Sequence, residues 1–289
     1  MRYQRTINNT IEFTGIGLHT GKRVSLKLSP APADTGIVFT RSDKNTSVCA
    51  RVDNVVATDY SSTLGWNGSS VQTVEHLLAA AAGLNIDNLY IELDSPEVPI
   101  MDGSAYPFAE RMLKTGIVQQ DKIRPHIKIV DTVEISEKDK YIKIEPSPFP
   151  CITFIMDYNH PLLNKQEFIY HYSIESFIKD IAPARTFGFL KDVEALQKMG
   201  LGMGGSLDNV VVLNDMDILN KEGLRFKDEF IRHKVLDLIG DISLLSKSFI
   251  GHITAYRSGH NLNTRLASAI LSSKDKWVEV GLTEEDVRV

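Results

Sequence analysis

Apolar and polar residues alternate along much of the first third of the chain, and shorter alternating or apolar runs recur in the second half. Alternation with a period of two is typical of β-strands that bury one face. On this basis strands are predicted at residues 24–28, 37–39, 52–56, 88–93, 127–133, 141–144, 151–156, 168–172, 210–213 and 250–256. The strands at 127–133 and 141–144 are expected to form a hairpin that turns at 137–140.

Helices are predicted where alanine dominates or where apolar residues recur at helical spacing. The alanine-rich run of residues 73–83 ends in Gly83, and the segment 106–114 has Pro107 in its first turn and Gly116 just beyond its end. The other predicted helices lie at residues 191–199 and 228–246, and a final helix follows the turn at 258–260 and ends at about residue 272.

The predicted elements follow the same order twice along the chain. Each half runs through strands, a helix that contains a histidine, a strand, a polar turn and a second helix. A polar stretch at residues 119–125, which ends in a proline, separates the halves and is interpreted as a linker. The sequence therefore predicts an α+β fold with two similar domains, residues 1–120 and 126–274, followed by a tail at 275–289.

The composition is that of a chain with a substantial buried core. Of the 289 residues, 43% are hydrophobic and 24% are charged, which excludes a disordered or fibrous protein. The 32 basic and 37 acidic residues give a net charge of −5 without any basic block, so nucleic acid is not an expected partner.

Membrane insertion and an oxidising compartment are not expected either. The most apolar window, residues 74–84, is too short to span a bilayer, and the N-terminal residues do not have the pattern of a signal peptide. Cys49 and Cys151 are far apart and form no C-x-x-C motif, which is typical of a reduced chain. We therefore expect a cytoplasmic protein, for which peripheral contact with a lipidic substrate stays open.

The predicted helix at 228–246 carries polar residues along the flank of its apolar stripe. His233 and Asp237 are four residues apart, so their Cβ atoms lie about 5–6 Å apart on one helical face, and Asp241 is one turn further along. An imidazole and a carboxylate at this spacing can bind one divalent cation. A solvated His–Asp pair is the alternative explanation.

A second pair of ionisable residues, Glu75 and His76, interrupts the apolar helix at 73–83. A glutamate buried in such a helix has to be paired or protonated, although an exposed strip on a half-buried helix would also accommodate the pair. Taken with His233 and Asp237, the pair completes a set of two histidines, one aspartate and a spare glutamate. Zinc hydrolases use three protein ligands and a nearby carboxylate as general base, so the set favours a metal site.

Two loop residues give weaker signals. His260 follows Ser258 and Gly259 in a polar turn, where histidines are often only solvent-exposed. If Asp241 reaches His260, the charged imidazole is favoured and could stabilise an oxyanion or protonate a leaving amine. Thr186 offers a hydroxyl beside aromatic residues, which by itself indicates little.

Two glycine-rich stretches, residues 15–21 and 201–206, are compatible with phosphate binding. Neither matches the P-loop or the dinucleotide motif, so tight turns are the simpler explanation. Residues 204–206 resemble the glycine-serine loop of small-molecule kinases with the ribosomal-protein-like fold, which leaves a kinase as an alternative function.

Six motifs, which begin at residues 15, 73, 184, 204, 233 and 258, read Gly-Ile-Gly-Leu-His-Thr-Gly, Thr-Val-Glu-His-Leu-Leu-Ala, Ala-Arg-Thr-Phe-Gly, Gly-Gly-Ser-Leu-Asp-Asn, His-Lys-Val-Leu-Asp-Leu-Ile-Gly-Asp and Ser-Gly-His. They occur in the order found in the UDP-3-O-acyl-N-acetylglucosamine deacetylase family, and the chain resembles that family from about residue 6 to 271. The resemblance implies two domains, each a sheet packed on a helix pair, with the helices sandwiched between the two sheets.

The resemblance also implies a zinc metalloamidase. His76, His233 and Asp237 are the expected ligands of one catalytic Zn²⁺ ion, and Glu75 is the expected general base. The expected reaction is hydrolysis of the N-acetyl group of UDP-3-O-(3-hydroxyacyl)-N-acetylglucosamine to the free amine and acetate, the committed step of lipid A biosynthesis in Gram-negative bacteria.

Further roles follow from the same resemblance. His260 is the expected cation that assists the leaving amine, with Asp241 as its partner, and Thr186 and Lys234 are expected near the oxyanion and the substrate. Arg257 stands where many relatives carry lysine, and a contact with the diphosphate is expected of it.

An insert at about 187–213 is expected to form the passage for the acyl chain of the UDP-linked substrate. Its expected lining is Phe187, Phe189, Val193, Ala195, Gly205, Val210 and Val212. Leu18, in the first glycine-rich stretch, and Arg257 are the other expected substrate-binding residues. A monomer is expected. A non-catalytic binding domain is the second alternative, and it would tolerate replacement of the glutamate at position 75.

Overall fold

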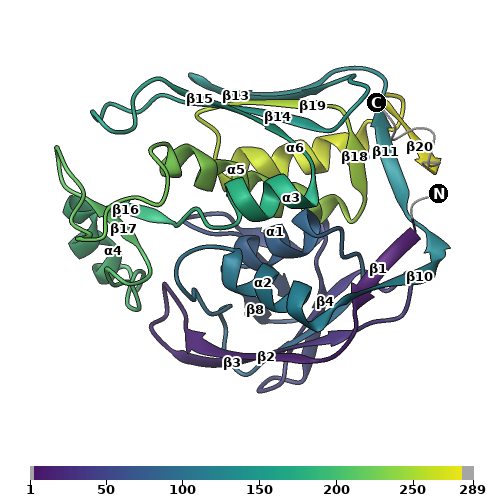
Figure 1. Ribbon diagram of the computed structural model, residues 1–289, viewed down its shortest axis with the longest axis horizontal. Helices are drawn as coiled ribbons and strands as arrows, with labels where there is room; N and C mark the ends of the chain where they lie inside the picture. The colour runs from purple at the N-terminus through teal and green to yellow at the C-terminus, as the bar shows by residue number, and fades with distance from the viewer. Residues whose placement is uncertain (1–2, 282–289) are drawn as a thin grey trace.

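Two five-stranded sheets form the outer layers of the structure, and the principal helices lie between them (Figure 1). The computed structural model describes residues 3–281. The strands of the two sheets are β2 Ile11–Ile16, β3 Arg23–Pro30, β4 Ile37–Arg41, β5 Thr46–Cys49 and β9 Leu89–Leu93 in the first half, and β12 Val133–Glu137, β13 Lys140–Glu145, β14 Cys151–Met156, β15 Gln166–His171 and β19 His252–Tyr256 in the second.

Both sheets have the same connectivity. In the first, the order is β2-β3-β9-β4-β5, with β4 parallel to β9 and the other pairs antiparallel. In the second, the order is β12-β13-β19-β14-β15, with β14 parallel to β19 and the other pairs antiparallel. The predicted α+β fold, with two similar halves and the helices between two sheets, is confirmed. The domain boundaries at residues 120 and 126 stay a prediction.

The space between the sheets holds helices α1 Glu75–Gly83, α2 Tyr106–Thr115, α5 Glu229–Ile242 and α6 His260–Ser272. Helix α1 is buried almost all round, which explains why its sequence is apolar apart from Glu75 and His76. Helices α1 and α5 cross closely at Gly240, where a Cβ atom would lie 2.1 Å from the backbone oxygen of Glu75. This crossing brings the two polar residues of α1 against the polar flank of α5.

Each half carries an insertion at the same point, between its fourth strand and its first long helix. In the first half, the insertion contains the 3₁₀ helix Val52–Asn54 and the small sheet β6 Val55–Ala57, β7 Thr63–Trp66 and β8 Ser69–Val71. In the second half, it is longer and contains α3 Ile174–Ser176, the π-helical turn Phe177–Ile181, β16 Phe187–Phe189, the 3₁₀ helix Leu190–Asp192, α4 Val193–Lys198 and β17 Val211–Leu213. Strands β16 and β17 pair in parallel.

Short strands join the halves at the side of the molecule where the described chain begins and ends (Figure 1). Strand β1 Tyr3–Ile7 pairs antiparallel with β10 Ile117–Ile123. Strand β11 Pro125–Ile129 pairs in parallel with β18 Ser248–Ile250 and antiparallel with β20 Trp277–Gly281. A 3₁₀ turn, Ser243–Leu245, follows α5 before β18.

Several predicted elements are wrong in detail. The polar stretch at 119–125 is not an irregular connection, because most of it belongs to β10, a largely exposed strand whose polar residues face solvent. The predicted hairpin at 127–133 and 141–144 is formed instead by β12 and β13, while β11 belongs to a different sheet. Residues 52–54 form a 3₁₀ turn, which Asp53 and Asn54 favour over a strand.

The predicted tail is also only partly correct. Residues 277–281 form β20, so this part of the tail is integrated into a sheet, whereas 282–289 lie outside the described residues.

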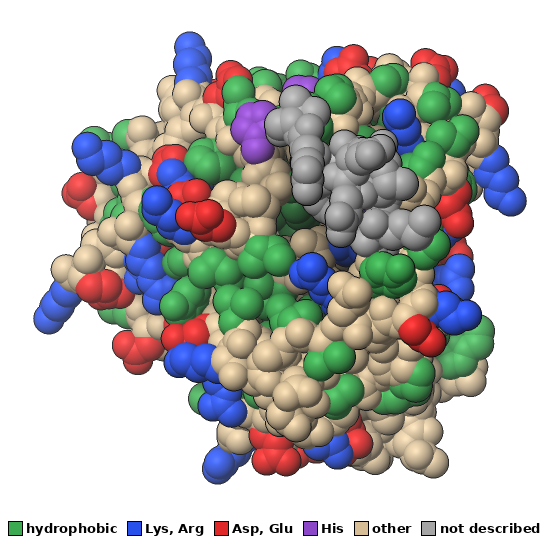
Figure 2. All heavy atoms as spheres, turned by 45° about the vertical axis from the view of Figure 1, so that its right-hand side comes forward, with side chains coloured by type: hydrophobic (Ala, Val, Ile, Leu, Met, Phe, Trp, Pro, Cys, Tyr) green, Lys and Arg blue, Asp and Glu red, His purple; other side chains and the backbone are tan. Residues whose placement is uncertain are grey.

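Acidic and basic side chains are interspersed on the face of the molecule shown in Figure 2, with apolar side chains gathered near its centre. This distribution agrees with the modest net charge of −5. Within residues 3–281, no helix is both long and apolar enough to cross a membrane.

Candidate metal centre and active site

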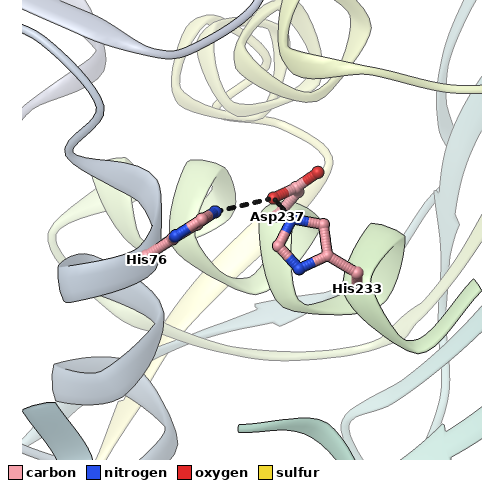
Figure 3. Close-up of side chains that lie close together, drawn as sticks. All are labelled: His76, His233 and Asp237. Atoms are coloured by element: carbon pink, nitrogen blue, oxygen red, sulfur yellow. Dashed lines mark ion pairs between the residues drawn. The ribbon is translucent and has the colours of Figure 1, made fainter. Parts of the chain in front are cut away.

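Two histidines and an aspartate converge where α1 crosses α5 (Figure 3). His76 is on α1, and His233 and Asp237 are one turn apart on α5. Asp237 Oδ1 lies 3.2 Å from His233 Nε2 and 3.7 Å from His76 Nε2. All three residues are buried, and among residues 3–281 they form the only His, Cys, Asp and Glu group of this kind whose ligand atoms lie within 4.8 Å of one another.

The donor set and its spacing fit a divalent metal ion. Ligand atoms bound about 2.1 Å from a tetrahedral ion are about 3.4 Å apart, which lies between the two separations of 3.2 and 3.7 Å. His233 Nδ1 lies 3.0 Å from the backbone oxygen of Ala184. When Nδ1 donates its proton to this carbonyl, Nε2 keeps the lone pair that a metal requires.

The electrostatic surroundings favour the protonation states of a cation site. Burial, reinforced by neighbouring His233, lowers the pKa of His76 to about 3. Burial alone would raise the pKa of Asp237, but its interactions with His233 and Lys234 outweigh burial and hold this pKa well below its ordinary value. Lys234 Nζ donates to Asp237 Oδ2 at 2.8 Å. A neutral imidazole and an ionised carboxylate are the forms that bind a cation.

A buried ion pair fixes the carbonyl that orients His233. Arg185 follows Ala184 directly, and both its backbone N–H and its Nε donate to Glu229 Oε1, at 3.0 and 2.8 Å. Arg185 is 4% exposed and Glu229 is 0% exposed. Glu229 is the first residue of α5, so the pair holds the chain around Ala184 against the helix that carries His233.

Glu75 is a buried carboxylate beside this cluster. Its Oε2 accepts the backbone N–H of Ser62 at 3.0 Å, and its Oε1 lies 4.0 Å from His260 Nε2. Burial raises the pKa of Glu75 to about 8, although the charge of His260 acts in the opposite direction. A carboxylate with a pKa near neutrality can accept a proton and return it.

His260 begins α6 and is held by a buried aspartate. Asp241 Oδ2 lies 2.9 Å from His260 Nδ1 and accepts a second hydrogen bond from Asn263 Nδ2 at 2.8 Å, while Ser62 donates to Asp241 Oδ1. Burial would lower the pKa of His260, but the charge and hydrogen bond of Asp241 raise it to about 9. The imidazole is therefore a cation at neutral pH, with Nε2 directed toward Glu75.

These residues line one cavity of about 350 Å³. Of the residues that the sequence singles out, Leu18, Glu75, His76, Thr186, Phe187, Phe189, His233, Lys234, Asp237 and His260 line it. Asp241 lies behind His260 and is 0% exposed. The Lys234 ammonium lies 5.7 Å from the centre of the Phe187 ring, at the boundary between the polar and apolar parts of the wall.

Other expected contact residues are not among those that line this cavity. Val193, Ala195, Gly205, Val210 and Val212 are in the same insertion as Phe187 and Phe189, but they are not part of the cavity lining. Arg257 forms an ion pair with Asp139 and has a left-handed backbone, with φ of 52°. Its guanidinium is thus directed to a neighbouring acidic side chain.

The cavity also has lining residues that the sequence did not indicate: Tyr60, Thr73, Tyr158 and Leu163. Tyr158 and Leu163 lie in the connection between β14 and β15, where no periodic pattern marks a side chain as inward-facing. Thr73 is two residues before Glu75, and its φ of 58° is unusual for a β-branched residue. Proximity in sequence to Glu75 was the one signal that could have identified it.

Comparison with known proteins gives a consistent result. A model of the family described as UDP-3-O-acyl N-acetylglycosamine deacetylase matches residues 4–272. The chain is 48% identical to the UDP-3-O-acyl-N-acetylglucosamine deacetylase of Hahella chejuensis, over 95% of this chain and 92% of that protein. It is 46% identical to the protein of the same name from Geotalea uraniireducens, over 98% of this chain and 93% of that protein. It is 45% identical to the one from Campylobacter fetus, over 99% of this chain and 97% of that protein.

Proposed function

This chain belongs to the UDP-3-O-acyl-N-acetylglucosamine deacetylase family, and we propose that it carries out the family's reaction with the residues gathered where α1 crosses α5. It is accordingly a hydrolase that removes the acetyl group from UDP-3-O-acyl-N-acetylglucosamine by cleaving an amide bond. The kinase alternative has no support. Gly204, which suggested a phosphate-binding loop, is a glycine because two loops pack closely there: a Cβ atom at this position would lie 2.2 Å from Gly17 O.

His76, His233 and Asp237 are the proposed ligands of one Zn²⁺ ion. Two imidazoles and one carboxylate form the three-ligand set of zinc hydrolases, which leaves one position open. When bound, zinc acts as a Lewis acid that polarises the acetamide carbonyl. The supporting observations are the converging donor atoms, the hydrogen bond from His233 Nδ1 to Ala184 and the low pKa of His76.

Glu75 is the proposed general base. Its Oε2 is engaged by the N–H of Ser62, which leaves Oε1 on the side of His260 to take the proton of the attacking water. The raised pKa of about 8 makes the carboxylate basic enough to hold that proton until it is passed on.

His260 is the proposed electrostatic and acidic partner. Asp241 keeps it charged, so the imidazolium can stabilise the negative charge that develops on the acetamide oxygen. Its Nε2 proton is then available to the leaving amine, directly or by exchange with Glu75. Thr186 and Lys234, which share the cavity wall, are proposed to contact the oxyanion and the substrate.

The apolar part of the cavity is the proposed site of the substrate's acyl chain. Leu18, Phe187, Phe189 and Leu163 line the cavity that also contains Glu75. This arrangement allows an acyl chain and an acetamide of the same molecule to be held together. We further propose that the protein is a cytoplasmic monomer, that it acts in lipid A biosynthesis, and that the acyl chain of its substrate is a 3-hydroxyacyl chain.

The convergence of His76, His233, Asp237 and Glu75 in one buried cluster carries the proposal, and the variant Glu75→Gln tests it. We expect wild-type protein to contain one zinc per chain and to release acetate from UDP-3-O-acyl-N-acetylglucosamine. Glu75→Gln should retain zinc while turnover falls by about 10²–10⁴-fold. The exposed Glu92→Gln is the matched control and should match wild type. A Glu75→Gln variant with wild-type acetate release, or one that loses its zinc, would show that the role of base is assigned to the wrong residue.

A further inference from the structure

Glu97 is a fully buried carboxylate outside the proposed reaction steps. It lies between β9 and α2 and is 0% exposed. Its Oε1 accepts the N–H of His19 at 2.8 Å and the hydroxyl of Thr73 at 2.8 Å, and its Oε2 accepts the N–H and the hydroxyl of Thr20 at 2.8 and 2.7 Å. All of these donors are neutral.

Burying the Glu97 carboxylate in this way costs free energy unless every one of its hydrogen-bond donors is in place. A buried carboxylate loses its hydration, and here hydrogen bonds from two separate segments replace that hydration. One segment is the glycine-rich stretch at residues 15–21, which contains His19 and Thr20. The other is the segment just before α1, which contains Thr73. Glu97 can be satisfied only when both segments occupy fixed positions.

The bond from Thr73 links Glu97 to the start of α1. Thr73 has a φ of 58°, a conformation that β-branched residues rarely adopt, so the surrounding contacts must hold it there. Its hydroxyl is bonded to Glu97, and it is two residues before Glu75 and three before His76. The direction in which α1 begins therefore depends on this hydroxyl.

The bonds from His19 and Thr20 link Glu97 to the wall of the cavity. Gly17 makes the approach possible, because a Cβ atom there would lie 2.3 Å from Glu97 Oε2. Leu18, which lines the cavity, is held between these contacts.

The same loop also holds the second glycine-rich stretch. The backbone oxygens of Leu18 and His19 accept the N–H groups of Gly204 and Met203, at 3.0 and 3.1 Å. The two glycine-rich stretches, one from each half of the chain, are thus docked on each other at the cavity wall.

We propose that Glu97 is a positioning residue for the deacetylation, which acts through Thr73 on the base-bearing helix and through Thr20 on the wall that faces the acyl chain. This inference rests on the proposed function. It predicts that the two links can be separated: the Thr73 link affects the chemical step, whereas the Thr20 link affects binding of the acylated substrate.

Three variants, together with one control and one conservative replacement, test the proposal by steady-state kinetics at full zinc occupancy. Thr73→Val should lower kcat about 10- to 100-fold with little change in KM, because small displacements of a catalytic group are costly. Thr20→Val should raise KM for the acylated substrate with little change in kcat. Glu97→Gln should show both effects, and Glu92→Gln, on the exposed side of β9, should show neither. Thr73→Ser keeps the hydroxyl and should retain wild-type kcat.

A second measurement does not depend on turnover. Amide hydrogen exchange at His19 and Thr20 should be faster in Glu97→Gln than in wild type, because their acceptor is weakened. If exchange and both kinetic constants stay at wild-type values while only the melting temperature falls, Glu97 has a purely structural role and the proposal is wrong. It is equally wrong if Thr73→Val and Thr20→Val change the same constant. Faster exchange in a chain that is inactive even as wild type would show that Glu97 fixes the segment of His19 and Thr20, and it would overturn the deacetylase function instead.

Discussion

The two halves of the molecule share one sheet topology, yet they contribute different chemistry to the cavity between them. The first half supplies Glu75 and His76, adjacent residues on its most buried helix. The second supplies His233 and Asp237 from α5 and His260 from α6. The proton acceptor and the cation therefore come from different halves. The difference indicates that the site exists only when α1 and α5 are packed together.

The insertions differ more than the sheets do. Both interrupt the chain before the first long helix of their half. The first forms a small sheet and contributes Tyr60 to the cavity wall, whereas the second contributes the aromatic residues Phe187 and Phe189. Two buried glutamates accompany this difference. Glu97 holds the segments of the first half through neutral donors, and Glu229 holds the second insertion through Arg185. A repeated scaffold thus positions two insertions with separate tasks.

The largest expected effect comes from removing one metal ligand from either half. His76→Ala and His233→Ala should each lose most of the bound zinc and essentially all acetate release, because an open three-ligand site has no spare protein ligand. Zinc content is measured by elemental mass spectrometry, and acetate release is measured on the same sample. His171→Ala, an exposed histidine on β15, is the control and should keep both. Full zinc occupancy in either ligand variant would remove that residue from the set and weaken the comparison between halves.

This comparison also shows what the sequence could and could not predict. The i, i+4 spacing of His233 and Asp237 follows from helix geometry, and a charged pair in an alanine-rich helix marked Glu75 and His76 as unusual. That the two pairs meet depends on the crossing at Gly240, a tertiary contact that no local pattern encodes. Strand β10 was missed because its partner β1 is more than a hundred residues away and its exposed residues are polar.

The residues around the cavity show the same limit. Tyr158 and Leu163 lie in a loop, where burial depends on what packs over the loop and not on periodicity. The resemblance to the family implies an acyl passage formed by residues 187–213. Of the lining residues expected within that range, only Phe187 and Phe189 are in the cavity wall. The role of each remaining residue stays a prediction.

An intermediate effect is expected from the pair that spans α5 and α6. Asp241 raises the pKa of His260 to about 9, so Asp241→Asn should let that pKa fall toward its ordinary value near 6.5. The alkaline limb of the pH–activity profile should move to lower pH, and peak activity should fall about 10- to 100-fold. The charged pair also stabilises the fold fully below about pH 6.5, and this contribution is lost as pH rises through about 9.

The control for this experiment is Asp228→Asn, a change of the same kind at the start of α5, where Asp228 pairs with Arg232 on the surface. Its pH profile should match wild type. An alkaline limb that does not move in Asp241→Asn, at unchanged zinc content, would assign that limb to a group other than His260. The charge of His260 would then have no part in the pH dependence, and the division of roles between the halves would fail.

The smallest effect is expected from the insertion of the second half and concerns substrate choice. Phe189→Ala removes an aromatic ring from the cavity wall and should raise KM for UDP-3-O-acyl-N-acetylglucosamine about 5- to 30-fold, because a partly buried ring contributes roughly 1–2 kcal/mol of apolar contact. A substrate without the acyl chain has nothing to lose there, so its kcat/KM should stay unchanged. Trp66→Ala, in the small sheet of the first insertion and 55% exposed, should leave both substrates unaffected. Equal losses for both substrates in Phe189→Ala would mean that the ring supports the reacting end of the cavity. In that case the two insertions would differ in size but not in task.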